Sequence, residues 1–348
     1  MIISKTPFRI SLFGGGTDYP KWYREHGGAV IGTAIDKYCY ITVRTLPPFF
    51  KHKHRIVYSN IELVQEIDEI DHPAVRAVLS QLSFREGLEV HHDADLPARS
   101  GLGSSSSFTV GLLNALNAKR GQMMSKDELS REAIRIEQEV IGESVGSQDQ
   151  IWAAHGGFNR IDFLPNGDFE VTPIILGNNR LRELKGSMQL FFTGFSRYAT
   201  EIAKDQIENM DKRTKQLTTM RDMVDEAMNI LQSADTPILE IGKLLDQSWK
   251  LKRELASSVT TPEIDEIYKA GLEAGAVGGK LLGAGGGGFI VFFAPPENHM
   301  KLRERLKDLV HVSFDFDKGG SKIMIYEPDQ VEQSNLNATQ SLSALVRK

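Results

Sequence analysis

The sequence predicts an α+β protein of two domains with a ligand cleft between them. Strand-like and helix-like patterns occur in both halves of the chain, and its 348 residues exceed one ordinary domain. We expect an N-terminal α+β domain over residues 1–180 and a C-terminal α+β domain over residues 181–330. The two would join near residues 175–187, and residues 331–348 would form a loosely attached tail. A cleft between two domains is the usual place for a ligand.

The composition excludes several classes of protein. Apolar residues make up 41% of the chain and charged residues 25%, which is typical of globular proteins rather than disordered or coiled-coil chains. The net charge of −5 provides no basic surface for nucleic acid, and no apolar run reaches the ~20 residues of a membrane helix. The N-terminus is a poor signal peptide, and the single cysteine, Cys39, cannot form an internal disulfide. We therefore expect a cytoplasmic protein that binds small molecules.

The N-terminal half alternates strands with helices. Apolar residues alternate before Gly14, and apolar residues at helical spacing follow Asp71. A second helix begins after Ser125, and Asn166-Gly167 favours a hairpin because this dipeptide tolerates positive φ. We expect strands at 2–3, 8–13, 29–44, 55–59, 88–96, 158–163 and 169–174, and helices at 71–85, 108–119 and 125–141.

The C-terminal half opens on an apolar strand and continues into a long, charged, helical region. Pro237 breaks that region, and Pro262 stands at the tolerated first turn of another helix. We expect strands at 188–195, 289–293, 311–316 and 322–327, and helices at 198–258 (interrupted at 235–237), from 261, and at 297–309.

A glycine- and serine-rich loop between a strand and a buried helix carries the clearest chemical signal. Its glycines let the backbone approach a ligand, and the serine N–H groups and hydroxyls at a helix N-terminus bind anions. A flexible linker is the alternative, but linkers rarely lead directly into a buried apolar helix. Because no Gly-Lys-Ser/Thr follows, the loop is not a Walker loop. We expect it to bind the phosphates of a nucleotide through Pro97, Ser100, Gly101, Leu102, Gly103, Ser104, Ser105 and Ser106.

A second glycine run, Gly283–Gly288, formally contains a GxGxxG pattern. A dinucleotide fingerprint follows a strand and opens a helix, whereas this run is expected to follow a helix and enter a strand. A tight turn is one alternative. The density of glycine favours close approach of the backbone to a ligand or to the first loop.

Three charged residues stand out from their surroundings. Arg9 lies on an otherwise apolar strand, and Asp18 follows a glycine turn, where an aspartate also commonly bonds its own backbone. Asp149 lies between a glycine-containing turn and the apolar residues 151–154. A partly buried carboxylate needs a partner or a function, so Asp149 is a candidate catalytic residue. Glu139 is expected to face solvent.

These segments, in this order, resemble the GHMP small-molecule kinases over roughly residues 5–293. Within that family the sequence looks most like the D-glycero-D-manno-heptose 7-phosphate kinases. Gly14–Asp18 stands where galactokinases carry an acidic residue and a histidine, and Gly146–Gln150 replaces their Gly-x-Met-Asp-Gln. These differences disfavour galactose as the substrate.

The resemblance implies an ATP- and Mg²⁺-dependent sugar-1-kinase that makes the α-1,7-bisphosphate used in nucleotide-heptose synthesis for surface polysaccharide. Asp149 would accept or stabilise the proton of the anomeric hydroxyl, and Arg9 would balance its charge. Ser105 and Glu137, both in the N-terminal domain, would hold Mg²⁺. The residues implied to contact the sugar are Gly15, Gly16, Thr17, Asp18, Gly285 and Gly286.

Several alternatives remain open at this stage. The enzyme could act on an unphosphorylated sugar such as fucose or mannose, or the fold could serve as a non-catalytic sugar sensor or a plain nucleotide-binding module. Residues 51–55 and Arg197 are candidates for binding a 7-phosphate. A solvated loop of mixed charge explains residues 51–55 at least as well. The partners expected are a sugar phosphate and ATP, and a homo-oligomer is left open.

Overall fold

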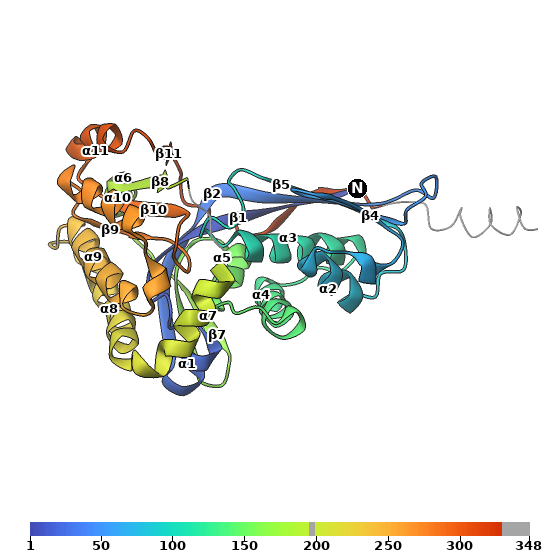
Figure 1. Ribbon diagram of the computed structural model, residues 1–348, viewed down its shortest axis with the longest axis horizontal. Helices are drawn as coiled ribbons and strands as arrows, with labels where there is room; N and C mark the ends of the chain where they lie inside the picture. The colour runs from blue at the N-terminus through green and yellow to red at the C-terminus, as the bar shows by residue number, and fades with distance from the viewer. Residues whose placement is uncertain (195–198, 329–348) are drawn as a thin grey trace, which may run out of the picture.

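The computed structural model describes residues 1–194 and 199–328, and their strands form two sheets (Figure 1). The larger sheet has the order β12-β1-β2-β5-β3-β4, with β6 beside β2 and β7 beside β6. The smaller sheet has the order β11-β8-β10-β9. Mixed helices and strands in both parts confirm the α+β prediction.

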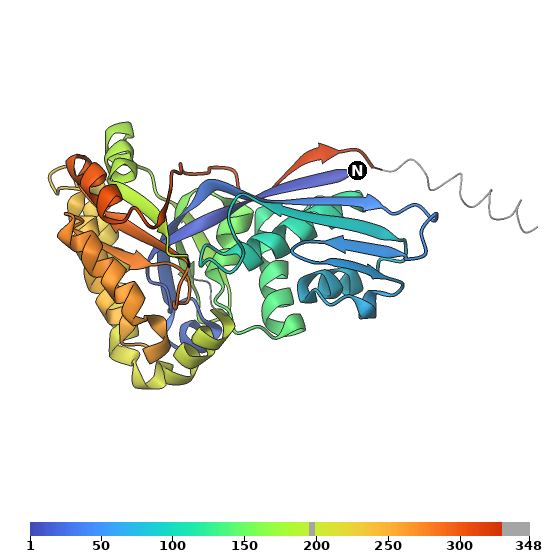
Figure 2. The same cartoon turned by 45° about the horizontal axis from the view of Figure 1, so that its top comes forward.

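The larger sheet is built on two long antiparallel strands, β1 and β2. Its strands are β1 (Ile2–Phe13), β2 (Gly28–Thr45), β3 (His54–Val57), β4 (Ile61–Val64), β5 (Leu88–Ala94), β6 (Phe158–Phe163), β7 (Phe169–Pro173) and β12 (Lys322–Tyr326). Four helices lie under one face of this sheet: α2 (Pro73–Gln81), α3 (Ser104–Lys119), α4 (Lys126–Arg135) and α5 (Gln148–His155) (Figure 2). α3 is buried on most sides because its residues are small and apolar on every face, as predicted.

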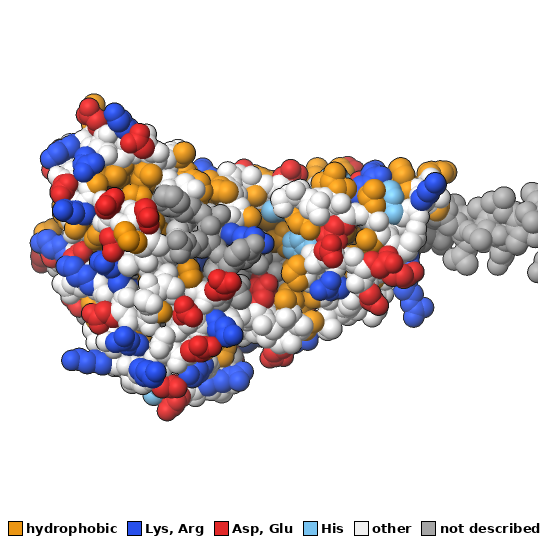
Figure 3. All heavy atoms as spheres, in the orientation of Figure 1, with side chains coloured by type: hydrophobic (Ala, Val, Ile, Leu, Met, Phe, Trp, Pro, Cys, Tyr) orange, Lys and Arg blue, Asp and Glu red, His pale blue; other side chains and the backbone are white. Residues whose placement is uncertain are grey.

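The smaller sheet centres on β10, whose five residues are all buried. Its strands are β8 (Met188–Phe192), β9 (Gly278–Leu281), β10 (Phe289–Phe293) and β11 (Val310–Val312). The helices of this part are α6 (Asn178–Ser187), α7 (Ala199–Asn209), α8 (Thr214–Gln232), α9 (Leu239–Arg253), α10 (Pro262–Glu273) and α11 (His299–Arg305), and α1 (Pro20–His26) precedes β2. In the described ranges, no helix is both long and apolar enough to span a membrane. Figure 3 shows charges of both signs interspersed on the visible face.

Several short elements were absent from the sequence prediction. α1, α5, α6, β4 and β9 each have ten residues or fewer, too short for a clear apolar period. The helix expected to run to Ile141 is α-helical to Arg135 and continues as a π-helix over Ile136–Ile141. It ends at Gly142, which adopts a left-handed conformation. The strand expected at 311–316 and the helix expected at 297–309 are shorter than predicted.

The last strand departs from the expected division of the chain. β12 lies in the larger sheet, antiparallel to β1, with Ile2 opposite Tyr326. The expectation placed it in the C-terminal unit because it follows that unit in sequence. β12 returns to this sheet because it hydrogen-bonds the backbone N–H and C=O groups along the outer edge of β1, which would otherwise be unpaired. The tail expected at 331–348 lies outside the described residues.

Candidate active site

The first glycine loop, residues 97–103, follows β5 and leads into α3. Gly101 and Gly103 have φ of +80° and +77°, which favours glycine at both positions. Gly103 is the N-cap of α3, and no side chain caps that end. The first N–H groups of α3 are therefore available to an anion.

The second glycine loop, residues 283–288, joins β9 to β10 and packs directly on the first. A Cβ on Gly283 would lie 2.5 Å from the Cα of Gly101, and the Phe289 N–H donates to the Ser100 carbonyl at 3.0 Å. The expected close approach of the two loops is confirmed. The expectation that a helix precedes this loop was wrong, because β9 intervenes. The dinucleotide reading still fails, since the loop enters a strand rather than a helix.

Arg9 and Asp149 form a two-pronged ion pair beside the first glycine loop. Arg9 Nε and Nη2 donate to the two carboxylate oxygens of Asp149 at 2.7 and 2.6 Å. Arg9 Nη1 donates to the Gly101 carbonyl at 2.6 Å, so the guanidinium also ties the pair to the loop. The Arg9 side chain is 5% exposed and that of Asp149 is 22% exposed. The arrangement fixes the carboxylate while leaving part of it accessible to a ligand.

Glu137 lies in a buried polar pocket behind the start of α3. Ser106 Oγ donates to Glu137 Oε2 at 2.9 Å, and Gln150 Nε2 donates to the same oxygen. Glu137 Oε1 is buried, and no residue of 1–194 or 199–328 hydrogen-bonds it. Burial raises the pKa of Glu137 to about 7.

The hydrogen bond to Glu137 comes from Ser106, the residue after the serine expected to share a metal with it, and the Ser105 assignment stays a prediction. Ser106 faces Glu137, whereas the side chain of Ser105 is exposed. Neighbouring residues point about 100° apart around an α-helix, so only one of them can face the carboxylate. Spacing in the sequence does not reveal which serine that is.

The unpartnered oxygen of Glu137 and the Ser106 hydroxyl suit a hard divalent cation such as Mg²⁺. In residues 1–194 and 199–328, no group of three or more His, Cys, Asp or Glu side chains could hold a metal. Mg²⁺ often binds through one or two carboxylates and takes its other ligands from phosphates and water. A single carboxylate beside a phosphate-binding loop fits that pattern.

Asp18 lies close to the ion pair, as part of the expected sugar-binding group. It is 2% exposed, and its Oδ1 accepts from the Gly16 N–H at 2.8 Å. Burial, with a smaller effect from Asp149, raises the pKa of Asp18. Thr17 turns its hydroxyl inward, 2.8 Å from the Gly14 carbonyl. The backbone bond of Asp18 and the inward Thr17 hydroxyl stabilise the turn itself.

The other residues expected at the sugar lie in the two glycine segments. The nearest neighbours of an added Cβ on Gly15 would be Ser11 and Gln148. The Gly286 N–H donates to the Val259 carbonyl at 2.9 Å, and a Cβ on Gly285 would meet that same carbonyl at 2.6 Å. Gly285 and Gly286 are therefore engaged with the protein's own backbone.

Two buried lysines near the site were missed by the sequence analysis. Lys252, at the end of α9, donates to the Gly283 carbonyl, and Lys280 on β9 donates to the Leu12 carbonyl at 3.0 Å. Burial lowers the pKa of Lys252 to about 8 and holds the pKa of Lys280 well below its ordinary value. Lys280 could have been noticed in the sequence, because a charged residue directly before Leu281-Leu282 is the same kind of signal that identified Arg9.

The cations expected to bind a 7-phosphate are not gathered here. His54 is buried, and Arg55 Nη1 donates to Glu89 Oε1 at 3.0 Å near the start of β5, at the opposite end of that strand from the first glycine loop. Arg55 therefore already has a carboxylate partner, which it shares with Arg44. Arg197 lies outside the described residues.

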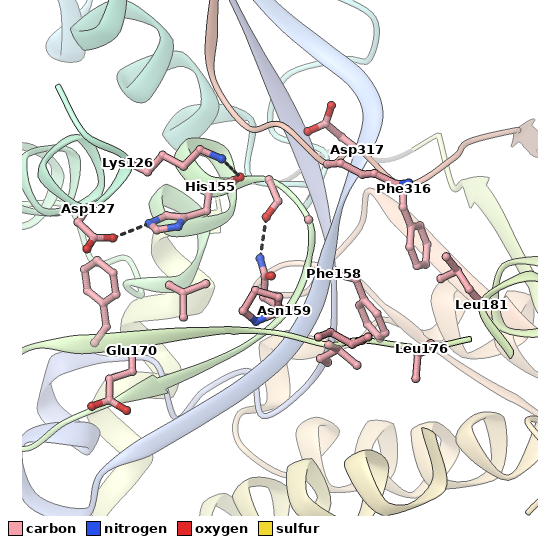
Figure 4. Close-up of a pocket in the computed structure, with 18 residues that line it drawn as sticks. Lys126, Asp127, His155, Phe158, Asn159, Glu170, Leu176, Leu181, Phe316 and Asp317 are labelled. Atoms are coloured by element: carbon pink, nitrogen blue, oxygen red, sulfur yellow. Dashed lines mark hydrogen bonds and ion pairs between the residues drawn. The ribbon is translucent and has the colours of Figure 1, made fainter. Parts of the chain in front are cut away.

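Two cavities lie away from the ion pair. The larger, about 740 Å³, is at the opposite end of α5 from Asp149 and contains the His155–Asp127 pair, whose Nε2 and Oδ1 are 3.1 Å apart (Figure 4). The smaller, about 410 Å³, is lined by Pro97 of the first glycine loop and by residues of β8, β10 and β11. This second cavity lies between the two sheets, where the sequence placed a cleft.

Comparisons with known proteins agree with this arrangement. The family model for the GHMP kinases N terminal domain matches residues 67–157, which include the first glycine loop, Glu137 and Asp149. The model for the GHMP kinases C terminal region matches residues 233–310, which include the second glycine loop.

Individual relatives match most of this chain. The D-glycero-alpha-D-manno-heptose 7-phosphate kinase of Campylobacter jejuni is 29% identical over 92% of this chain and 98% of its own. The bifunctional fucokinase/GDP-fucose pyrophosphorylase of Arabidopsis thaliana is 25% identical over 89% of this chain and 31% of its own. The crystal structure of a D-glycero-D-manno-heptose 1-phosphate kinase from Bacteroides thetaiotaomicron, at 24% identity, matches with a TM-score of 0.77 over 94% of this chain and 100% of that one.

Proposed function

The chain belongs to the GHMP kinases, and on that premise we propose that it phosphorylates the anomeric hydroxyl of D-glycero-D-manno-heptose 7-phosphate. Membership makes it a kinase that transfers a phosphoryl group from ATP to an alcohol group. The proposed product is the α-1,7-bisphosphate, an intermediate of nucleotide-heptose synthesis for surface polysaccharide. The observation that carries the proposal is the Arg9–Asp149 pair, held against a glycine loop at the start of α3.

The choice of sugar rests on a sequence relative rather than on a contact. The Campylobacter jejuni protein named for heptose 7-phosphate matches nearly the whole of both chains, and this supports a heptose 7-phosphate acceptor. The Bacteroides thetaiotaomicron protein is named for a 1-phosphate and supports the fold alone at its lower identity. The fucokinase relative makes an unphosphorylated sugar such as fucose, or the related mannose, the second candidate.

Phosphoryl transfer asks a protein mainly for positioning and charge neutralisation. The free N–H groups at the start of α3 hold the phosphates of ATP. They point out of the N-terminus of the helix, which is the end that favours negative charge. Arg9 holds Asp149 by two hydrogen bonds, which fixes the carboxylate relative to the loop. Asp149 orients the anomeric hydroxyl and accepts its proton as the hydroxyl oxygen bonds to the terminal phosphorus of ATP. The bond from that phosphorus to the bridging oxygen breaks, and ADP leaves.

Glu137 and Ser106 are the residues that would hold Mg²⁺. When bound there, the ion neutralises charge on the phosphates. Gln150 orients Glu137 by donating to one carboxylate oxygen, which leaves the other directed to the metal.

The test is ATP turnover with a panel of sugars, each with and without a terminal phosphate. We expect turnover with heptose 7-phosphate, and phosphorus NMR should resolve the product as the α-1,7-bisphosphate. Turnover of unphosphorylated sugars alone would refute the heptose 7-phosphate assignment in favour of a fucose- or mannose-type kinase. An absence of turnover with every sugar, in folded protein that binds ATP, would indicate a non-catalytic sensor.

A further inference from the structure

Three cations and two carboxylates gather where the two glycine loops meet. The cations are Arg9, Lys252 and Lys280, and the carboxylates are Asp18 and Asp149. Apart from Asp149, each of these residues is 5% exposed or less. With all five ionised the cluster carries one net positive charge in a place from which water is largely excluded.

The two lysines have no carboxylate of their own. Within the described ranges, neither ammonium lies within 4.0 Å of an acidic oxygen, and the protein partner of each is a backbone carbonyl. A buried ammonium bonded only to a neutral carbonyl is poorly compensated for its lost hydration. Asp149 is already paired with Arg9, so it is not available to balance Lys252. Neither lysine therefore has a carboxylate partner in the cluster.

Lys252 is the better placed of the two lysines. Its carbonyl partner, Gly283, touches Gly101, whose own carbonyl accepts from Arg9. A continuous path of contacts thus joins Lys252 to the catalytic pair through the first glycine loop. Lys280 bonds instead to Leu12 at the end of β1, away from that loop.

We propose that Lys252 binds a phosphate group in the active site. An ammonium has three N–H donors, and the Gly283 carbonyl takes one of them. The other two suit the oxygens of a phosphate, an anion that would balance the ammonium. The proposal rests on the proposed kinase function, and the group bound is either the terminal phosphate of ATP or the phosphate that the sugar carries.

The test compares Lys252→Met and Lys252→Arg with the control Lys250→Met. Lys250 lies two residues away on α9 but is exposed and bonds Asp246 at 2.7 Å, so its removal changes charge without touching the cluster. KM is measured for ATP, for heptose 7-phosphate and for the unphosphorylated heptose. Calorimetry measures the binding of ADP, of the non-hydrolysable analogue AMPPNP and of heptose 7-phosphate itself.

We expect Lys252→Met to lower the affinity for one phosphate-bearing ligand by about 10-fold or more, which is the usual effect of losing a charged hydrogen bond. A loss confined to heptose 7-phosphate would assign Lys252 to the acceptor's phosphate. A loss for AMPPNP with ADP unchanged would assign it to the terminal phosphate of the donor. Lys252→Arg should retain more affinity than Lys252→Met in either case, because it keeps the charge.

Affinities of Lys252→Met within twofold of those of Lys250→Met for all ligands would overturn the proposal. Removing an uncompensated ammonium should not lower the melting temperature of the free protein. If Lys252→Met does unfold, Lys252→Gln decides, because the amide can still donate to the Gly283 carbonyl but carries no charge. Wild-type affinity of a folded Lys252→Gln variant for every ligand would overturn the proposal. Failure of the wild-type enzyme to phosphorylate heptose 7-phosphate would refute the proposed function alone, because AMPPNP and ADP binding still test Lys252.

Discussion

The two glycine loops look alike in sequence but perform different tasks in the fold. The first glycine loop ends at the N-terminus of α3, where backbone N–H groups lack protein partners and the Arg9–Asp149 pair stands alongside. The second glycine loop joins two antiparallel strands, and its backbone bonds to neighbouring segments: Gly286 N–H donates to Val259, and the Gly288 carbonyl accepts from Thr193. The first loop leaves backbone donors open, whereas the second uses its backbone to hold neighbouring segments.

The difference teaches that glycine content alone does not identify a phosphate-binding loop. Glycine permits close approach in both loops, but only a helix that begins after the loop leaves several N–H groups unpaired and aimed in one direction. Where a loop joins two paired strands, the backbone N–H groups next to the loop hydrogen-bond the neighbouring strand. The chemistry therefore depends on whether a helix or a strand begins after the glycines.

The largest expected effect tests the catalytic side of the first loop. Asp149→Asn keeps the shape of the side chain but removes its charge and its ability to accept a proton. We expect kcat to fall at least ~10²-fold, the lower range for a positioned acid–base group. Steady-state kinetics of the purified variant measure this effect.

Asp127→Asn is the matched control, because Asp127 pairs with His155 in the larger cavity at the other end of α5. It should retain kcat within about twofold. Near-normal turnover by a folded Asp149→Asn variant would show that Asp149 takes no part in the mechanism. The proposed difference in task between the two glycine loops would then lose its catalytic basis.

An alanine in each loop gives the next largest effect. Gly103→Ala and Gly285→Ala both force a side chain onto a positive φ, of +77° and +132°, at a cost of about 1–3 kcal/mol. The new Cβ at 103 would press on Asp149 Oδ2 at 3.3 Å, whereas that at 285 would meet the Val259 carbonyl at 2.6 Å. We expect Gly103→Ala to lower kcat more than stability and Gly285→Ala to lower stability more than kcat, measured by kinetics and urea unfolding.

Gly177→Ala serves as the reference, since its φ is −60° and nothing lies within 4 Å of the added Cβ. If Gly285→Ala instead raised KM for the sugar without a loss of stability, the second loop would contact the sugar directly. That result would restore the sugar-binding role predicted for it from the sequence.

The smallest expected effect concerns pH and the metal behind the first loop. The pKa of Glu137 is raised from its ordinary value of 4.5 to about 7, so the folded protein holds a proton there that the unfolded chain has lost. The contribution of Glu137 to the free energy of unfolding is therefore greatest below pH 4.5 and falls as the pH rises through 7. Because Mg²⁺ must displace that proton, its affinity should rise about 10-fold per pH unit up to about pH 7 and then level off.

Calorimetry of Mg²⁺ binding between about pH 5.5 and 8.5 would check this slope, with Glu137→Gln as the control that lacks it. A flat profile in the wild type would show that the metal does not bind at Glu137. A matched comparison of Ser106→Ala with Ser105→Ala then decides which serine assists the metal, and we expect the larger loss of Mg²⁺ affinity from Ser106→Ala.

The long elements were the predictable part of the fold. β2 was predicted over nearly its whole length, and both glycine loops were located from composition. β1 was predicted only at 2–3 and 8–13, and α3 only from residue 108, because polar residues interrupt or precede their apolar patterns. The short helix α5 was missed, although it carries Asp149 at its first turn. Eight residues are too few for a period to separate from chance, and its packing against α3 and α4 stabilises it instead.

The amino-acid sequence by itself determined the α+β class and located the first glycine loop, Arg9 and Asp149, because each depends on local residue types and spacing. Only the tertiary structure decided that Ser106 rather than Ser105 meets Glu137, that β12 returns to the first sheet, and that Lys252 joins the site. Each of these three outcomes depends on which segments, far apart in the chain, pack against one another. Apolar periodicity shows which face of a segment is buried, but not which distant segment covers that face.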